Sequence, residues 1–167
     1  MRIDIRRRLF AAVALAACLV LTAAPPAQAQ TAQLVQNAID VLPNPSNPVE
    51  NRINAARDRS VLARDSDTAT AALMGVLAND STAAVRSAAA AAIGYAAFPS
   101  AAPIQALIQA LSSDTSPQVR LAAANGLGVV GVDSDAALQA LKAAAAGDAD
   151  PQVRASAKTV SERLSSN

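Results

Sequence analysis

The residues of this chain that could take part in chemistry are charged side chains that recur at a fixed 34-residue interval. Three aspartates and three arginines follow this interval: Asp80, Asp114 and Asp148, and Arg86, Arg120 and Arg154. A carboxylate and a guanidinium can form two parallel hydrogen bonds, and an aspartate in a turn can accept backbone N–H groups at the start of a helix. Residues that occur once per repeat serve the stacking that all repeats share, so we predict a structural role for these six.

The composition argues against catalysis. The 167 residues include no histidine and a single cysteine, Cys18. A histidine base, a Ser-His-Asp triad, a histidine-ligated metal and a cysteine-ligated zinc ion are therefore not possible. The formal net charge of +1 does not favour a nucleic-acid partner. We expect no catalytic residue, no metal, no cofactor and no binding of nucleic acid.

The N-terminal segment 1–29 has the composition of a secretion signal. Four arginines precede an uncharged, mainly apolar run from residue 9 to residue 24. Ala27-Gln28-Ala29 then supplies the small residues that a signal peptidase requires. Cleavage after Ala29 would leave a mature chain that begins at Gln30. We predict an exported bacterial protein, periplasmic or extracellular, with no membrane span once the signal is removed.

Cys18 offers an alternative fate for the N-terminus. The segment Leu15-Ala16-Ala17-Cys18 is similar to a bacterial lipobox, in which the cysteine is lipidated and becomes the first mature residue. The apolar run continues past this cysteine to Leu21, where a lipoprotein usually becomes polar, so simple export is favoured. A chain that begins at Gln30 keeps 10 basic and 12 acidic side chains, a net charge of −2. It has no cysteine, so disulfides cannot stabilise it.

Each 34-residue interval contains the pattern of two amphipathic helices, which we name helix A and helix B. Ser100 is placed to cap one helix A. Apolar residues of this helix follow the i, i+3, i+4, i+7 spacing: Ile104, Leu107, Ile108 and Leu111. Pro117 can open the following helix B, because its missing N–H costs nothing at the first helical position. The next unit repeats the arrangement, with Ser134 and Asp150-Pro151 at the two helix starts.

The segment from Asp114 to Gly128 resembles the short HEAT repeat, which is also found in phycobilin lyases. Asp80 to Gly94 and Asp148 to Ala157 are weaker copies of it. The resemblance implies an all-α fold, a right-handed solenoid of stacked antiparallel helix pairs. It also implies that the six recurring aspartates and arginines form a hydrogen-bonded ladder between neighbouring repeats. Tetratricopeptide repeats share the same interval, but alanines such as Ala90 replace the bulky residues of that pattern.

The resemblance sets the expected domain organisation. About three clear repeats occupy residues 66–167, and residues 30–65 form a helical cap or a degenerate first repeat. Arg52 lies in register with Arg86 at the 34-residue interval. It also belongs to a group of arginines that alternate with acidic residues, a pattern that favours a charge-balanced, solvated helix.

The surface expected to bind a partner is the exposed stripe of helix B, opposite its packed face. This stripe is uncharged and lightly apolar, and it consists of Ser87, Ala91, Leu121, Asn125, Ala155 and Thr159. It suits a protein or peptide, whereas a nucleic acid needs basic and aromatic residues. We predict an exported, non-catalytic scaffold or adaptor for another protein. The alternatives are an enzyme or accessory subunit of the phycobilin-lyase type, which the resemblance implies, and an envelope adaptor anchored by a lipid on Cys18.

Overall fold

The computed structural model describes residues 40–41, 44–62, 67–96, 101–131 and 133–166. All of them belong to one of the chain's two compact units, Val35–Asn167. The predicted secretion signal, Cys18, the predicted cleavage site after Ala29 and the expected helix cap Ser100 lie outside the described residues.

Most of the described residues are helical, and none of them lies in a strand. Seven helices follow one another along this part of the chain: α3 (Val49–Leu62), α4 (Asp67–Asn79), α5 (Ala83–Ala96), α6 (Ala101–Ser113), α7 (Pro117–Val130), α8 (Asp135–Gly147) and α9 (Pro151–Ser165). Three-residue turns join α4 to α5, α6 to α7 and α8 to α9, and each turn begins with one of the recurring aspartates. No helix in these ranges combines the length and the apolar composition needed to cross a bilayer.

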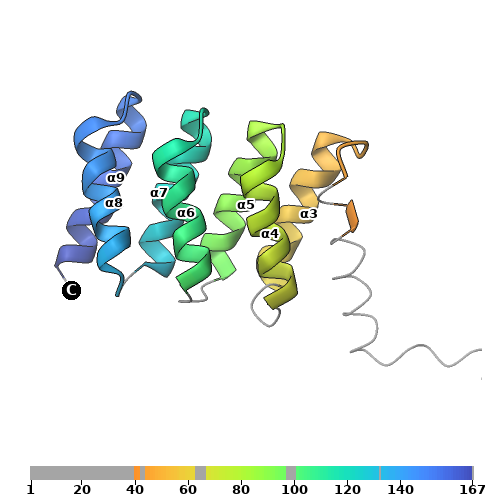
Figure 1. Ribbon diagram of the computed structural model, residues 1–167, viewed down its shortest axis with the longest axis horizontal. Helices are drawn as coiled ribbons and strands as arrows, with labels where there is room; N and C mark the ends of the chain where they lie inside the picture. Colours follow the sequence, from red (N-terminus) through yellow and green to blue (C-terminus); the bar gives the residue numbers. More distant parts are fainter. Residues whose placement is uncertain (1–39, 42–43, 63–66, 97–100, 132, 167) are drawn as a thin grey trace, which may run out of the picture. The chain divides into compact units, whose positions relative to one another are not determined.

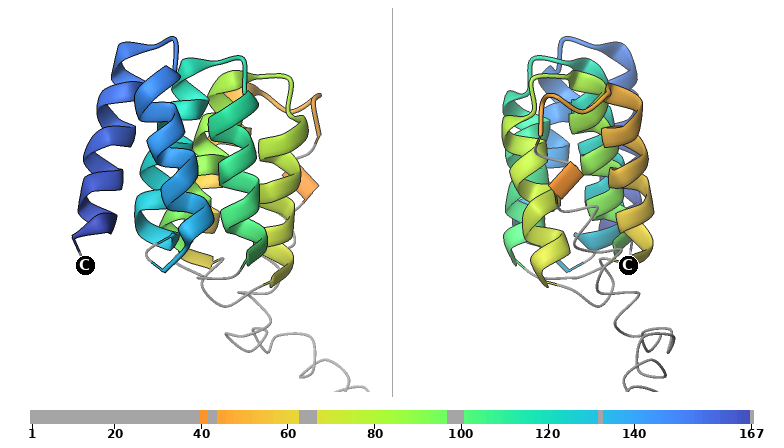
Figure 2. Two further views of the ribbon diagram at one scale, coloured as in Figure 1. Left: turned by 60° about the vertical axis from the view of Figure 1, so that its left-hand side comes forward. Right: turned by 90° about the vertical axis from the view of Figure 1, so that its right-hand side faces the viewer.

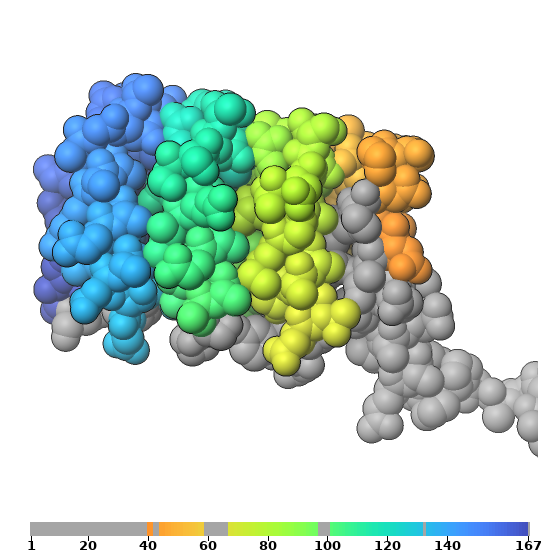
Figure 3. Space-filling view, in the orientation of Figure 1, coloured from red at the N-terminus to blue at the C-terminus, as the bar shows by residue number. Residues whose placement is uncertain are grey.

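The helices of Val35–Asn167 form two layers (Figure 1). The A helices α4, α6 and α8 lie side by side in one layer, and the B helices α3, α5, α7 and α9 in the other. Figure 2 shows the two layers from other sides. Successive helices of each layer pack against one another, and Figure 3 shows the A helices of neighbouring pairs in contact. The predicted all-α solenoid of helix pairs is confirmed.

The helix starts follow from local sequence. Pro117 is the first residue of α7, as predicted. The Ser134 hydroxyl accepts a hydrogen bond from the Ala137 N–H and so caps α8. The Asp150 carboxylate caps α9, since it accepts from the N–H groups of Gln152 and Val153. These side chains satisfy backbone donors that the first helical turn leaves without a partner.

The core uses the same repeat positions in every pair. One leucine from each A helix and one valine from the start of α5, α7 and α9 are fully buried: Leu73, Leu107 and Leu141, and Val85, Val119 and Val153. Burial of such a side chain stabilises the fold by about 1.5–3 kcal/mol. Many of the remaining core positions are alanines, such as Ala89 and Ala123. Small side chains let the helices approach closely, so the short distance between neighbouring B helices depends on these alanines.

Two glycines set the closest approach of α5 and α7. A Cβ atom added to Gly94 would lie 2.6 Å from the Gly126 Cα. A Cβ atom on Gly126 would lie 3.2 Å from a methyl carbon of Leu107 and 3.3 Å from the carbonyl oxygen of Ala90. The first of these distances is shorter than van der Waals contact allows, so a side chain at Gly94 would push the two B helices apart.

Candidate functional site

Arg86 and Arg120 each meet the recurring aspartate of the next helix pair, whereas Arg154, which was predicted to do the same, pairs with no carboxylate among the described residues. Arg86 donates from Nε to Asp114 Oδ2 at 2.8 Å and from Nη2 to Asp114 Oδ1 at 2.9 Å. Arg120 forms the same two bonds with the Asp148 carboxylate, both at 2.8 Å. Each arginine thus uses the edge that carries Nε and Nη2 to bind the aspartate of the next pair, in the parallel geometry typical of strong charge-assisted bonds.

Each rung of this ladder is also tied to its own turn. Arg86 donates from Nη1 to the Asp80 carbonyl oxygen at 2.8 Å, and Arg120 from Nη1 to the Asp114 carbonyl oxygen at 3.0 Å. The Asp114 carboxylate accepts the N–H of Ser116, two residues further on, at 2.8 Å. Asp80 and Asp148 accept the corresponding N–H in the same way. The same residues therefore fix both the turn inside a pair and the contact between pairs.

The first rung differs from the others. Arg52 is only 3% exposed, and its Nη1 donates to Asp80 Oδ2. Its Nη2 donates to the Thr82 hydroxyl at 3.3 Å. The prediction of a solvated helix is therefore wrong for Arg52, because α3 packs on α5 as a B helix and buries this side chain. Its register with Arg86 was the informative signal.

Two of the ion pairs, Arg86–Asp114 and Arg120–Asp148, shift the pKa values of their own side chains. The hydrogen bonds from Arg86 hold the pKa of Asp114 below its usual 3.8 against the opposing effect of burial, and the Ser116 N–H lowers it further. The bonds from Arg120 lower the pKa of Asp148 in the same way. The pKa of each arginine is raised, mainly by its hydrogen bonds to the aspartate. All four groups stay charged at neutral pH, and the two carboxylates are poor candidates for a catalytic base.

The part of the chain that the structure describes holds no group of three or more histidine, cysteine, aspartate or glutamate side chains placed to bind a metal ion. The acidic pair of the last turn has other roles there. Asp148 binds Arg120, and Asp150 caps α9. The chemistry of these side chains is hydrogen bonding within the stack.

The B helices present a second set of recurring positions, which we call the B-helix surface. It consists of three columns at the 34-residue interval: Ile53, Ser87, Leu121 and Ala155; Arg57, Ala91, Asn125 and Thr159; and Tyr95, Val129 and Arg163. All six residues of the predicted stripe lie in the first two columns. Asn125, Ala155 and Thr159 are exposed, whereas Ser87, Ala91 and Leu121 are half-buried. Leu121 also packs against the core, so it offers less surface to a partner than its sequence position suggests.

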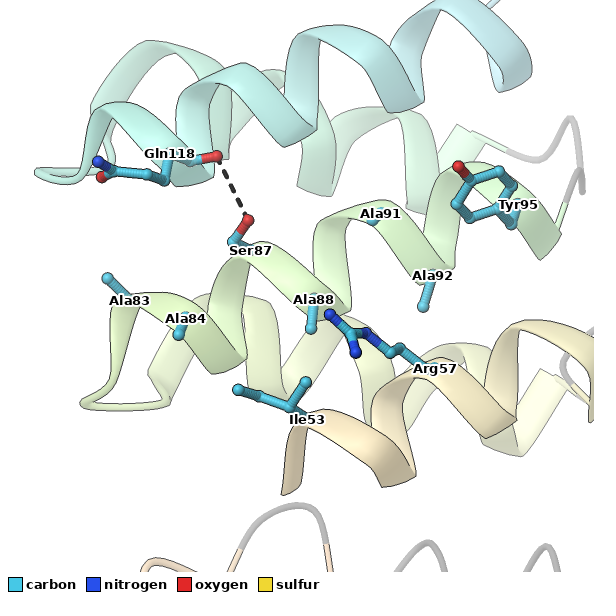
Figure 4. Close-up of a pocket in the computed structure, with 10 residues that line it drawn as sticks. All are labelled: Ile53, Arg57, Ala83, Ala84, Ser87, Ala88, Ala91, Ala92, Tyr95 and Gln118. Atoms are coloured by element: carbon cyan, nitrogen blue, oxygen red, sulfur yellow. Dashed lines mark hydrogen bonds between the residues drawn. The ribbon is translucent and has the colours of Figure 1, made fainter. Parts of the chain in front are cut away.

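Two grooves divide this surface. The larger one has a volume of about 660 Å³ and lies between α3 and α5, with a floor of alanines (Figure 4). Ile53 and Arg57 border it on the α3 side, and Tyr95 lies at one end. On the side of α5 that faces α7, the Ser87 hydroxyl donates to the Gln118 carbonyl oxygen at 3.4 Å. A second groove of about 520 Å³ lies between α7 and α9: its lining includes Asn125, Val129, Ala155, Thr159 and Arg163.

The third column contains residues that sequence reasoning missed. Tyr95 is 68% exposed and Val129 is 47% exposed, and these two are among the few large apolar side chains on the described surface. They are related by the 34-residue interval and follow Ser87 and Leu121, respectively, by two helical turns. Extension of the predicted stripe by one more helical turn would have found them. The B-helix surface also includes Arg57 and Arg163 but no acidic residue. It is therefore positively charged, whereas the six predicted positions are uncharged.

Similarity to known proteins supports the helical-repeat fold of this chain and does not identify an activity for it. No functionally curated protein matches the sequence. Among solved structures, human deoxyhypusine hydroxylase in complex with glycerol is similar, with a TM-score of 0.67 and 25% sequence identity. The similarity covers 85% of this chain and 47% of that protein. The chain therefore corresponds to about half of the enzyme's length.

The sequence also matches a model of HEAT repeats over residues 70–161, more than half of the chain. This range holds most of the three helix pairs, the Arg86–Asp114 and Arg120–Asp148 ion pairs between them and most of the B-helix surface. The resemblance of the segment from Asp114 to Gly128 to a HEAT repeat is thus confirmed. By its sequence, its paired helices and its stacked units, the chain belongs to the HEAT-repeat family.

Proposed function

We propose that this protein is an exported, non-catalytic scaffold that binds another protein through the B-helix surface. HEAT repeats generally act as protein-interaction modules. One observation carries the proposal, which is the exposure of Tyr95 and Val129 at the same repeat position beside open grooves. Aromatic residues are enriched where proteins bind one another, and truncation of such an anchor costs about 2 kcal/mol or more.

Charge introduced at the two apolar positions should abolish binding. We expect the variant Tyr95→Glu/Val129→Glu to lose at least about 100-fold in affinity for the partner captured by the wild-type protein from its native envelope. Both side chains are exposed, so the helical circular dichroism spectrum should not change. The affinity is measured with the purified partner by titration calorimetry.

The matched control carries the same two charges on the A helices. Gln105 and Gln139 are exposed and share one repeat position at the 34-residue interval, on α6 and α8. The variant Gln105→Glu/Gln139→Glu should bind as the wild-type protein does. Equal loss in both variants would mean that general negative charge weakens binding, and full binding by both would place the partner elsewhere.

Export is the second part of the proposal. Its support is the sequence of residues 1–29, a basic segment, an apolar run and an Ala-x-Ala site. Mass spectrometry of the protein isolated from its native cells should find an unmodified N-terminus at Gln30. A lipidated N-terminus at Cys18 would favour the envelope-anchored adaptor instead, and an intact Met1 would contradict export.

An enzymatic role is the second candidate. It has one observation in its favour, since the similar protein deoxyhypusine hydroxylase is an enzyme. The phycobilin-lyase alternative has only the resemblance of the repeats. We rank both below the scaffold, because the sequence has no histidine and the described ladder aspartates are engaged with arginines.

A further inference from the structure

The B helices carry a row of residues that faces the next pair in the stack. On α5 this row includes Arg86 and Gly94, which contact Asp114 and Gly126 of the following pair. The repeat places Arg154 and Glu162 at these positions on α9. The outward side of α9 is therefore equivalent to the sides of α5 and α7 that bind a neighbouring repeat.

Arg154 is held in the same way as the ladder arginines. It donates from Nη1 to the Asp148 carbonyl oxygen at 2.7 Å and to the Ala149 carbonyl oxygen at 3.0 Å. Arg120 likewise donates from Nη1 to the carbonyl oxygens of Asp114 and Thr115 in its own turn, at 3.0 and 3.4 Å. The two donors that Arg120 directs at a carboxylate, Nε and Nη2, have no carboxylate partner on Arg154 among the described residues. The guanidinium of Arg154 is thus fixed by its turn while its bidentate edge stays open to a ligand.

A further repeat packed like the others does not fit this side of α9. The positions that bring B helices close together are Ala90 and Gly94 on α5, and Ala124 and Gly128 on α7. On α9 they are Lys158 and Glu162, whose side chains are 69% and 67% exposed and pair with each other at 3.9 Å. Two long charged side chains keep another helix from the close approach that the glycines allow.

We propose that the edge of Arg154 is a carboxylate-binding site for another protein, which presents an aspartate from a turn between two helices. The ladder supports this choice, because Asp114 and Asp148 fill the equivalent edges from such turns. The charges of Lys158 and Glu162 select a partner with a polar, charge-complementary surface around that aspartate. A second copy of this chain is a poor occupant, since Ser46 stands where Asp80 stands in the next repeat.

The site is tested with a displayed library of two-helix hairpins whose turn residues are randomised, selected against the purified protein. Turns that carry an aspartate should be enriched. A selected hairpin should bind at least tenfold more weakly to the variants Arg154→Gln and Arg154→Lys, because lysine keeps the charge but not the two-donor edge. Lys142 is an exposed cation on α8, so Lys142→Gln serves as the matched control and should bind normally.

A second measurement does not depend on the folding of these variants. Replacement of the aspartate by asparagine in the selected hairpin should abolish binding to the wild-type protein. The absence of acidic turns, the absence of any enrichment, or unchanged binding by Arg154→Gln would overturn the proposal. Normal binding by Arg154→Lys would also overturn it, since simple charge attraction would then suffice. The variant Tyr95→Glu/Val129→Glu should retain the hairpin, which separates this site from the B-helix surface.

Discussion

The variant Asp114→Ala should lower the free energy of unfolding by about 2–4 kcal/mol, among the largest effects that we expect from a single substitution. The substitution removes two hydrogen bonds to Arg86 and one to the Ser116 N–H. It leaves a largely buried guanidinium without the carboxylate that neutralises it. Because the lost bonds span two helix pairs, the melting temperature should fall as well. Urea denaturation followed by circular dichroism measures the change at pH 7.

The control for this prediction is Asp135→Ala. Asp135 is exposed in the first turn of α8 and interacts with the helix dipole, so the loss should stay below about 1 kcal/mol. An effect of Asp114→Ala no larger than that of the control would contradict a stabilising role for the ladder.

The same experiment at acid pH tests the electrostatic origin of the effect. A carboxylate whose pKa is lowered by folding contributes its full stabilisation above its ordinary pKa of 3.8. That contribution disappears as the pH falls through the lowered value. The difference between wild type and Asp114→Ala should therefore shrink below about pH 4. A difference that stays constant to about pH 2 would assign the loss to packing instead.

The variant Gly94→Ala should destabilise the protein by about 1–3 kcal/mol, although alanine is the better helix former. The added methyl group would lie 2.6 Å from the Gly126 Cα. Backbone cannot rotate aside as a side chain can, so α5 and α7 must separate and the contacts between their repeats must loosen. Thermal denaturation compared with the wild-type protein gives the size of the effect.

Gly75 is the matched control, because it also lies inside a helix but a methyl group added there would have no atom within 4 Å. Gly75→Ala should stabilise the protein by about 0.5–1 kcal/mol through helix propensity alone. Opposite signs for the two substitutions would show that the close crossing, and not the loss of glycine, causes the change. Stabilisation by both would mean that the helices tolerate a wider spacing.

The recurrence of residues made much of the fold predictable. A position that is buried in one repeat is buried in the others, so the burial of Leu73 predicts that of Leu107 and Leu141. Ser134 and Asp150 could be identified as helix caps from the local sequence. Arg52 was harder to place, because its own segment alternates charges like a solvated helix. Its burial depends on Asp80, which is distant in the sequence and belongs to the next repeat.

The surface was less predictable than the core. Helical spacing indicates which residues share a face, but the exposure of each one depends on how far the next helix covers it. Leu121 is partly covered and Tyr95 is not. The grooves depend on the same contacts, since one of them combines residues of α3 and α5. The orientation of the Arg154 guanidinium could not be predicted from the sequence either. It depends on the turn carbonyl oxygens that bind Nη1 and leave Nε and Nη2 without a carboxylate.

Amide NMR of the isotope-labelled protein mixed with its captured partner shows directly whether that partner binds the B-helix surface. We expect the largest chemical-shift changes at Ala91, Tyr95, Asn125 and Val129. The A helices, including Gln105 and Gln139, should be unaffected. Changes centred on the A helices, with the B-helix surface unperturbed, would contradict binding at the B-helix surface.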